Sequence, residues 1–240
     1  MTPTRRATLA LLGAAPLSLR ARADAAKDGR LASRPAPPTL PAPAPGAFIQ
    51  LRGGAMLYVP KTFVAASTMP LLVMLHGAGG DALSIARDHA PSADARGFLV
   101  LAPKSRNATW DLHHMPESDD ANIVDDALDQ AFAHAAAGRL ALAGVSDGAS
   151  FALSLGLANG DLFSDVIAFS AGLFRIRARV GSPRIFISHG RNDRVLPFSG
   201  AERIVATLTG AGYDVAFHPF DGEHEVPPEV LSTALDRFLQ

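Results

Sequence analysis

The chain is predicted to fold as an α/β sandwich, in which helices cover both faces of a mostly parallel sheet of about eight strands. The first observation is that short, nearly continuous apolar runs alternate with longer amphipathic stretches. Such runs are typical of parallel strands that are covered on both faces. The second observation is that hydrophobic residues make up 48% of the 240 residues, which is enough to build one sizeable core without metals or disulfides.

The predicted elements follow one another in the order that such a sandwich requires. Arg52-Gly53-Gly54 is a turn sequence between two apolar runs, and it predicts a hairpin of the strands 48–51 and 55–59. The other predicted strands are 71–75, 98–102, 140–143, 166–169, 184–188 and 214–220. The predicted helices are 82–95, 121–136, 149–157, 201–208 and 228–239. Ligands of such sheets bind beyond the carboxyl ends of the strands, so polar residues there are the first candidates for function.

Charge and cysteine content exclude several classes of protein. The 22 Lys and Arg residues nearly balance the 23 Asp and Glu residues, so the basic excess of a nucleic-acid-binding protein is missing. The chain contains no cysteine, which excludes thiol nucleophiles, disulfides and cysteine-ligated metal centres. A nucleophile in this chain has to come from another side chain.

Residues 1–23 have the layout of an export signal. Arg5-Arg6 precede an apolar stretch, Ala7–Leu19, and the segment ends in Arg20-Ala21-Arg22-Ala23. This layout resembles a twin-arginine signal, and its apolar stretch is too short to span a bilayer as a stable helix. We expect an exported protein, periplasmic or secreted, without stable membrane insertion after signal removal; the alternative is a disordered N-terminus of a cytosolic protein. Cleavage after Ala23 would change the net charge from −1 to 18 − 23 = −5.

Residues 24–47 are rich in proline and alanine, and residues 48–240 form the predicted folded domain. Proline lacks the amide donor of other residues and disfavours helix before it. The segment 24–47 is therefore predicted to be an extended tether between the signal and the domain.

The pentapeptide Gly144-Val145-Ser146-Asp147-Gly148 is the strongest functional motif in the chain. It lies directly after a predicted strand and directly before a predicted helix. This setting predicts a nucleophile elbow, the sharp turn that exposes a reactive serine at the edge of the sheet. An ordinary Gly/Ser loop is the alternative, since such pentapeptides are frequent in chains rich in alanine and glycine.

A glycine-rich turn, His76-Gly77-Ala78-Gly79-Gly80, ends an earlier predicted strand. The backbone amide of Ala78, together with that of Asp147, is predicted to form an oxyanion hole for charge that develops on a carbonyl oxygen. The rival hypothesis is a phosphate-binding loop, but no Gly-Lys-Ser/Thr sequence completes one. His76 is expected to shape this turn.

Asp193 and His224 follow later strands of the predicted sheet. Asp193 comes after the run Ile187-Ser188-His189-Gly190, and His224 lies in a loop between the last strand and the last helix. The order Ser146, Asp193, His224 is the chain order of the triad in α/β-hydrolases. Asp193 as a surface turn residue is the alternative.

With these motifs, residues 48–240 resemble the α/β-hydrolase superfamily. Within it they are similar to small bacterial serine esterases of the phospholipase/carboxylesterase and polyhydroxybutyrate-depolymerase-like (feruloyl-esterase-like) groups. The resemblance implies an ester hydrolase with Ser146 as nucleophile, His224 as base and Asp193 as its orienting acid, and it implies no cofactor. At Asp147 the chain departs from the group, which often carries glutamine there.

Gly77 and Trp110 are the predicted substrate-binding residues, with a core anchor as the equal alternative for Trp110. His113 and His114 with Glu117, Asp119 and Asp120 resemble a metal cluster, but a polar loop explains them as well, and we predict no metal. Only about a dozen residues separate the strands that end near Phe169 and begin at Arg184, which leaves no room for a cap domain.

We therefore predict an open, lidless cleft that bulky or polymeric esters can enter. A serine peptidase or amidase with the same triad, and a noncatalytic binding protein on this fold, are the two alternatives. The acyl and alcohol specificity and the oligomeric state stay open.

Overall fold

The computed structural model of the chain describes residues 29–111, 118–175 and 178–240. The predicted signal at 1–23 lies outside the described residues, as do His113, His114 and Glu117 of the possible metal cluster. In the described part of the chain, no helix is long and apolar enough to cross a membrane.

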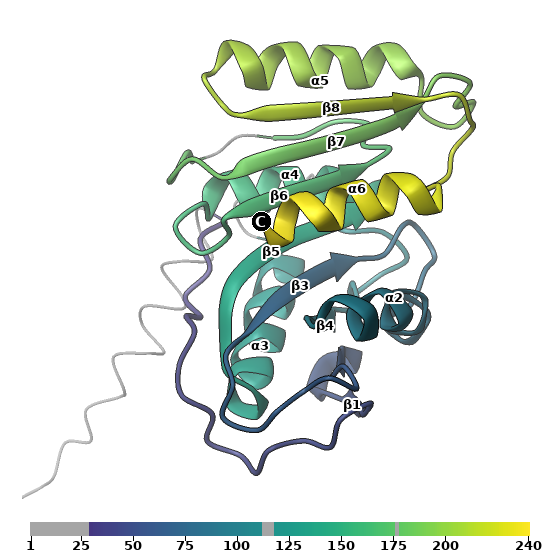
Figure 1. The fold of residues 1–240 in the computed structure, drawn as a ribbon. Coiled ribbons are helices and arrows are strands. Elements are labelled where there is room, and N and C mark those ends of the chain that lie inside the picture. The colour runs from purple at the N-terminus through teal and green to yellow at the C-terminus, as the bar shows by residue number, and fades with distance from the viewer. Residues whose placement is uncertain (1–28, 112–117, 176–177) are drawn as a thin grey trace, which may run out of the picture.

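Eight strands form one sheet in the order β1-β2-β4-β3-β5-β6-β7-β8 (Figure 1). Strands β1 and β2 pair antiparallel, β2 pairs antiparallel with β4, and all other neighbours are parallel. This arrangement confirms the predicted α/β fold. The strands are β1 (Phe48–Gln50), β2 (Met56–Tyr58), β3 (Met69–Leu75), β4 (Leu99–Ala102), β5 (Ala137–Val145), β6 (Asp165–Phe169), β7 (Arg184–Gly190) and β8 (Val215–Phe220), with the short 3-10 turn η2 (Arg52–Gly54) inside the predicted hairpin.

The order of the strands reverses at β3, because β4 lies on one side of it and β5 on the other. A crevice forms at such a reversal beyond the carboxyl ends of the two strands. Here β3 leads into the His76–Gly80 turn and β5 leads into Ser146. The topology therefore places both sequence motifs at the same edge of the sheet.

Helices cover both faces of the sheet. Helices α2 (Ala82–Arg96) and α6 (Pro228–Leu239) pack on the face that contains Leu72 and Met74 of β3. Helices α3 (Asp119–His134), α4 (Asp147–Ala158) and α5 (Phe198–Gly210) pack on the opposite face. Successive residues of a strand point to opposite faces, so a strand covered on both sides is apolar throughout, as the predicted runs are.

The segment between β6 and β7 is short. Its described residues, 170–175 and 178–183, contain no helix. In this described part of the segment there is accordingly no cap over the carboxyl edge of the sheet.

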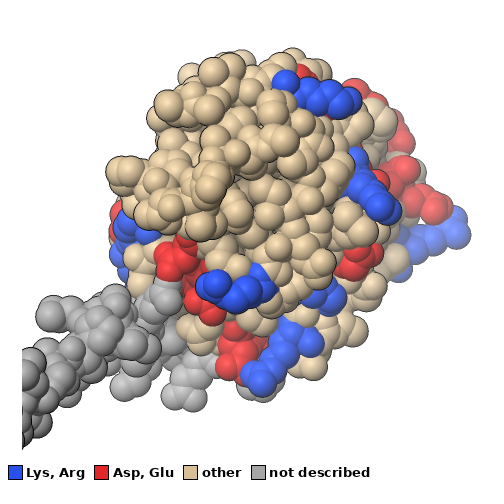
Figure 2. Space-filling model, turned by 90° about the horizontal axis from the view of Figure 1, so that it is seen from below, with Lys and Arg blue, Asp and Glu red and all other residues tan. Residues whose placement is uncertain are grey.

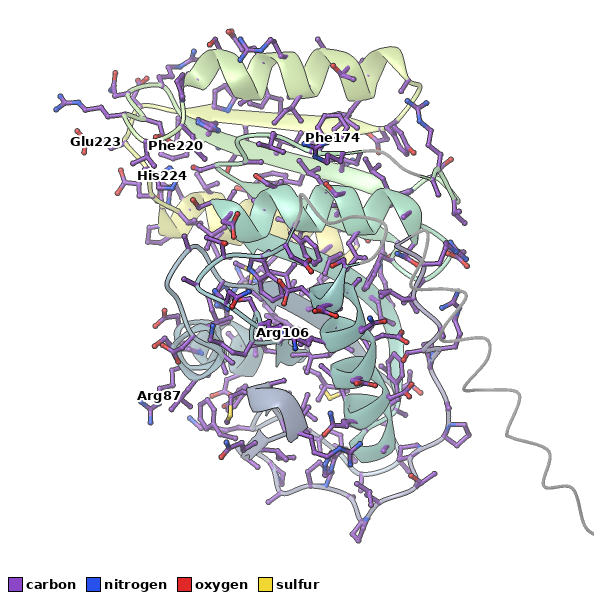
Figure 3. All side chains as sticks on the ribbon, turned by 180° about the vertical axis from the view of Figure 1, so that it is seen from behind. Arg87, Arg106, Phe174, Phe220, Glu223 and His224 are labelled. Carbon is purple, nitrogen blue, oxygen red and sulfur yellow. The ribbon has the colours of Figure 1, made fainter. Side chains whose placement is uncertain are left out.

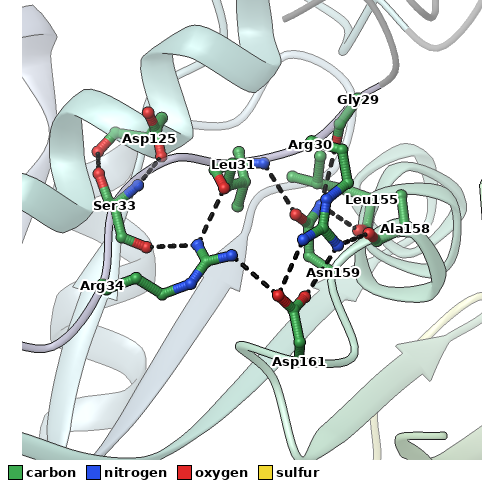
Figure 4. A network of polar contacts seen from close by, with 10 residues as sticks. All are labelled: Gly29, Arg30, Leu31, Ser33, Arg34, Asp125, Leu155, Ala158, Asn159 and Asp161. Atoms are coloured by element: carbon green, nitrogen blue, oxygen red, sulfur yellow. Dashed lines mark hydrogen bonds and ion pairs between the residues drawn. The ribbon is translucent and has the colours of Figure 1, made fainter. Parts of the chain in front are cut away.

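Residues 29–34, which we call the strap, belong to the segment predicted to be an extended tether. The strap is extended, but it lies against the domain (Figure 4). The Arg30 guanidinium makes two hydrogen bonds of 2.8 Å to the Asp161 carboxylate and one of 2.6 Å to the carbonyl of Ala158, the last residue of α4. Arg34 binds the same carboxylate at 2.9 Å, and the Leu31 side chain between them is buried.

Buried polar groups of the domain complete the contact with the strap. The Asn159 side chain accepts a hydrogen bond from the Leu31 N–H and donates one to the Gly29 carbonyl, both 2.8 Å long. Ser33 bonds the Asp125 carboxylate through its N–H and the Asp125 carbonyl through its hydroxyl. The strap thus joins α3 to the end of α4 and is part of the folded unit.

The proline-rich residues that follow the strap stay at the surface. Residues 35–51 contain no charged side chain. Figure 2 views the molecule from below, where this segment and β1 lie, and shows a broad area without Lys, Arg, Asp or Glu. The N–H groups of Thr39 and Leu40 both donate to the Ala133 carbonyl at the end of α3.

Arg30→Ala is expected to lower the free energy of unfolding by about 1–2 kcal/mol at pH 7. It removes the charged donor of the Ala158 carbonyl and two of the hydrogen bonds that the Asp161 carboxylate accepts, while the Arg34 hydrogen bond to Asp161 stays. The Arg30 hydrogen bond is the main cause that holds the pKa of Asp161 below its ordinary value. Its contribution is therefore present above the ordinary pKa of aspartate and lost as the pH falls through the folded-state pKa. Urea denaturation of both proteins at pH 7 and at acid pH measures the difference, which should narrow in acid.

Arg194→Ala is the control for this prediction. Arg194 is exposed and its ion pair with Glu223 is 3.9 Å long, so its loss should change the stability by less than about 0.5 kcal/mol. Equal stability of the Arg30→Ala and Arg194→Ala proteins would show that the strap is only a tether.

Candidate active site

Ser146 lies in a strained turn between β5 and α4. Its φ of 57° and ψ of −115° are unusual for a residue with a side chain. A Cβ on Gly144 would lie 2.3 Å from the Gly148 backbone, and a Cβ on Gly148 would lie 2.5 Å from the carbonyl oxygen of His76. Only glycine fits at these two positions, which is the physical reason for the Gly-x-Ser-x-Gly pattern.

The structure brings the three predicted triad residues together at the carboxyl edge of the sheet. His224 Nε2 lies 2.9 Å from Ser146 Oγ, and His224 Nδ1 lies 2.7 Å from Asp193 Oδ2. The three residues follow β5, β7 and β8. Figure 3 shows His224 beside Glu223 and Phe220, at the end of the sheet where these strands stop.

The Asp193 carboxylate is buried and saturated with donors. Its Oδ1 accepts hydrogen bonds of 2.8 Å from the N–H groups of Val195 and Leu196. Burial alone would raise the pKa of Asp193, but the hydrogen bonds from Leu196, His224 and Val195 outweigh it and hold the pKa below its ordinary value. Asp193 therefore stays ionised at neutral pH and faces His224 Nδ1 as an acceptor.

His189 supports the Asp193 loop from inside the protein. Its fully buried ring places Nε2 at 2.8 Å from the Leu196 carbonyl and at 3.2 Å from Asp193 Oδ2. Both neighbours are acceptors, so Nε2 carries a proton. In the sequence, His189-Gly190 was noted only as the end of the run that precedes Asp193. The structure places the His189 ring beside the Asp193 carboxylate.

Gly190 lets the loop that carries His224 approach β7. A Cβ there would lie 2.1 Å from the Glu223 carbonyl oxygen. Backbone hydrogen bonds from Arg191 to Phe220 (2.9 Å) and from Asn192 to Gly222 (3.0 Å) hold the two loops together. The distance between His224 and Asp193 is thus set by backbone contacts as well as by the side chains.

His76 fixes the predicted oxyanion turn. The Ser105 N–H donates to His76 Nε2 (3.2 Å), so Nε2 is unprotonated and Nδ1 carries the hydrogen that it donates to the Gly77 carbonyl (2.8 Å). Burial lowers the pKa of His76, which favours this neutral form. The Gly77 carbonyl and the Ala78 N–H belong to one trans peptide and point in opposite directions. His76 therefore helps to orient the Ala78 N–H, together with the Gly80 N–H, which donates to the same carbonyl at 3.0 Å.

The two predicted oxyanion donors are available. Neither the Ala78 N–H nor the Asp147 N–H donates to any residue that the structure describes. Gly77 lies against the serine, because a Cβ added to it would be 3.5 Å from Ser146 Cβ. The two turns that carry these amides thus meet at the serine.

A cavity of about 270 Å³ opens beside Ser146. Apolar side chains of Leu173, Val195 and Leu196 form part of its wall, and Leu173 and Val195 are exposed at 42% and 65%. The other residues that line it are Thr109, Trp110, Ser146, Asp147, Ser150 and Gly172. Gly77, predicted as substrate-binding, lies beside Ser146 but is not one of these lining residues.

Trp110 has both of the roles that its sequence position left open. Its buried indole stacks on Phe151 with ring centroids 5.3 Å apart, and its Nε1 donates to the His76 carbonyl at 2.8 Å. Trp110 also lines the cavity, and its backbone N–H donates to Asp147 Oδ2 at 2.7 Å. It anchors the core and forms part of the cavity wall.

Residues 116–240, just over half of the chain, match the Phospholipase/Carboxylesterase family. The chain belongs to this family. It is therefore a carboxylic-ester hydrolase with the α/β-hydrolase fold. No curated protein matches the chain.

Solved structures share the fold of this esterase at low identity. S-formylglutathione hydrolase from Staphylococcus aureus is 13% identical, with 81% of this chain and 97% of that chain covered and a TM-score of 0.64. The fluorophosphonate-binding serine hydrolase F of the same organism is 16% identical, with coverages of 82% and 100% and a TM-score of 0.62. A phospholipase/carboxylesterase from Dyadobacter fermentans is 20% identical, with coverages of 83% and 100% and a TM-score of 0.56.

Several residues that line the cavity of this esterase carry no functional motif in the sequence. Ser150 lies one helical turn after Ser146, and its hydroxyl accepts a hydrogen bond from the Gly172 N–H at 3.1 Å. Leu173 and Leu196 lie in loops whose sequences contain no recognisable motif. The only available signal was position, since these loops follow β6 and β7 at the carboxyl edge.

Asp119 and Asp120, two members of the possible metal cluster, bind Arg106 and Asp111 of the preceding loop instead. Asp119 pairs with Arg106, while Asp120 accepts hydrogen bonds of 2.8 Å from the N–H groups of Arg106 and Asp111. Among the described residues, no group of three or more metal-ligating side chains comes together.

Replacement of His76 tests its control of the oxyanion turn. His76→Asn keeps a donor near the position of Nδ1, whereas His76→Gln places its amide near Nε2 and loses the hydrogen bond to Gly77. We expect His76→Gln to lower kcat about 10–100-fold with little change in KM, and His76→Asn to retain kcat within about fivefold. The expected loss is smaller than the roughly 10²–10³-fold cost of a lost oxyanion donor, because the Gly80 N–H still binds the Gly77 carbonyl.

Steady-state kinetics on a p-nitrophenyl ester measures both constants. The two variants lose the same ring contact with Trp110, so each serves as the control of the other. A kcat for His76→Gln that equals or exceeds that of His76→Asn would contradict the role of the Nδ1 hydrogen bond.

Proposed function

We propose that this esterase is a serine hydrolase that works through an acyl-enzyme, with Ser146, His224 and Asp193 as its triad. The observation that carries the proposal is the unbroken hydrogen-bonded chain from Ser146 Oγ to His224 (2.9 Å) and from His224 to Asp193 (2.7 Å). The strained backbone of Ser146 supports it, because such strain is typical of a nucleophile elbow.

In the first half of the reaction Ser146 attacks the ester carbonyl. Asp193 accepts from His224 Nδ1–H, so Nε2 is free to take the proton of the Ser146 hydroxyl as the C–O bond forms. The carbonyl oxygen becomes an oxyanion, and the Ala78 and Asp147 N–H groups stabilise it. His224 then returns its proton to the leaving alcohol.

In the second half water takes the place of the alcohol. His224 removes a proton from the water as it attacks the acyl-enzyme, a second oxyanion forms, and the acid leaves as Ser146 regains its proton. The ionised Asp193 stabilises the His224 cation in both halves. No step requires a cofactor.

We also propose that the cleft is open to bulky esters. The described residues between β6 and β7 contain no helix, and Leu173 and Val195 at the cavity rim are exposed. A series of p-nitrophenyl esters of increasing chain length beside a panel of anilides tests the substrate range. Faster hydrolysis of anilides than of esters would favour a peptidase or amidase.

Ser146→Ala is expected to abolish labelling by a fluorophosphonate probe and to lower kcat for a p-nitrophenyl ester by about 10⁴-fold or more, since the nucleophile is lost. Ser199→Ala changes an exposed serine of α5 and should leave both readouts unchanged. Labelling and normal turnover of the Ser146→Ala protein would refute the proposed nucleophile. Failure of the probe to label either the wild type or Ser199→Ala would count against a reactive serine nucleophile.

A further inference from the structure

We propose that the Asp147 side chain makes this site selective for neutral esters, and that it discriminates against substrates with a carboxylate or phosphate close to the scissile carbonyl. The inference rests on the proposed function of Ser146. It concerns the side chain of Asp147, whereas the proposed mechanism uses only its backbone N–H.

The carboxylate of Asp147 is held at the wall of the cavity. Asp147 is the first residue of α4, follows Ser146 directly and is half-buried. Its Oδ2 accepts the 2.7 Å hydrogen bond from the Trp110 N–H, and Trp110 itself lines the cavity. Among the described residues, Oδ1 has no hydrogen-bond donor. The negative charge is thus fixed between the nucleophile and Trp110.

No other described residue that lines the cavity is charged. The remaining wall consists of apolar side chains, glycine, and the neutral polar groups of Thr109, Ser146 and Ser150. A substrate group that enters this cavity therefore meets one fixed anion and no cation from the described wall.

Three cations on the loops that carry Thr109 and Val195 are directed elsewhere. Lys104 Nζ donates to the Ser105 and Asn107 carbonyls, and Arg106 pairs with Asp119. On the other side of the site, Arg194 is exposed and pairs with Glu223. In the described part of the chain, none of these three cations forms an ion pair with Asp147.

The physical consequence is repulsion of like charges in a partly enclosed cavity. Two such charges interact more strongly there than in bulk water, because the low-polarizability wall reduces screening. The apolar contacts of Leu173, Val195 and Leu196 add a preference for aliphatic groups. The geometry thus points to neutral aliphatic esters as the preferred substrate class.

Asp147→Asn is the informative variant. Asparagine has the same shape and keeps a carbonyl oxygen that can accept from the Trp110 N–H, and the backbone N–H of residue 147 is unchanged. Only the charge is removed. Asp221→Asn is the matched control, because Asp221 is a surface residue whose side chain is 89% exposed and the change in net charge is the same.

The experiment compares kcat/KM for p-nitrophenyl butyrate and for mono-p-nitrophenyl succinate, which differ by one carboxylate at the end of the acyl group. We expect the wild type to prefer the butyrate at least about tenfold, which corresponds to about 1.4 kcal/mol, and Asp147→Asn to reduce this preference by about tenfold. Asp221→Asn should leave the preference unchanged. An unchanged preference in Asp147→Asn, or an equal effect of Asp221→Asn, would overturn the inference.

Salt dependence supplies a second measurement that needs no variant. Raising the ionic strength from about 0.02 M to about 0.5 M should narrow the wild-type preference, because salt screens a charge at an open cavity. A preference that does not change with salt would count against a charge effect. Failure of the proposed function looks different: Ser146→Ala would keep its turnover, whatever the charge preference.

Discussion

The close approach of two turns, at the carboxyl ends of the neighbouring strands β3 and β5, is the constraint on which the rest of this site depends. The turn at Ser146 packs so tightly on the end of β3 that a Cβ on Gly148 would lie 2.5 Å from the His76 carbonyl oxygen. The same carbonyl accepts the hydrogen bond from the Trp110 indole. Nucleophile, oxyanion turn and cavity wall are therefore fixed to one another, and the strained φ of Ser146 is maintained by this packing.

Helix α4, which begins directly after Ser146, holds this turn in place. All its residues from Gly148 to Ala158 are buried, so the helix cannot shift without exposing apolar surface. At its far end the strap supplies Arg30 to the Ala158 carbonyl, one of the groups that a helix terminus leaves without an internal partner. A segment that precedes the sheet in the chain thus stabilises the helix that begins after the nucleophile.

Two carboxylates near Ser146, those of Asp193 and Asp147, differ in their burial and in the number of hydrogen bonds that they accept. Asp193 is buried, accepts hydrogen bonds from three donors and acts on His224, so its charge holds the imidazole in position. Asp147 is half-buried and has one backbone donor, so more of its field reaches the cavity. The same residue type can position a base in one environment and select substrates in the other, because the number of donors and the depth of burial differ.

The sequence by itself determined the alternation of elements, the triad candidates and their order, because these depend on local patterns: apolar runs, turn glycines and the ends of strands. It also located Trp110 and the His76–Gly80 turn near the site, through the rule that function lies at the carboxyl edge. Only the tertiary structure decided that the strap joins the domain and that Trp110 is both anchor and wall. Only there do Leu173, Val195 and Leu196 gather beside Ser146. These features rest on contacts between residues far apart in the chain: Arg30 meets Asp161 across 131 positions, and no local pattern records such a pairing.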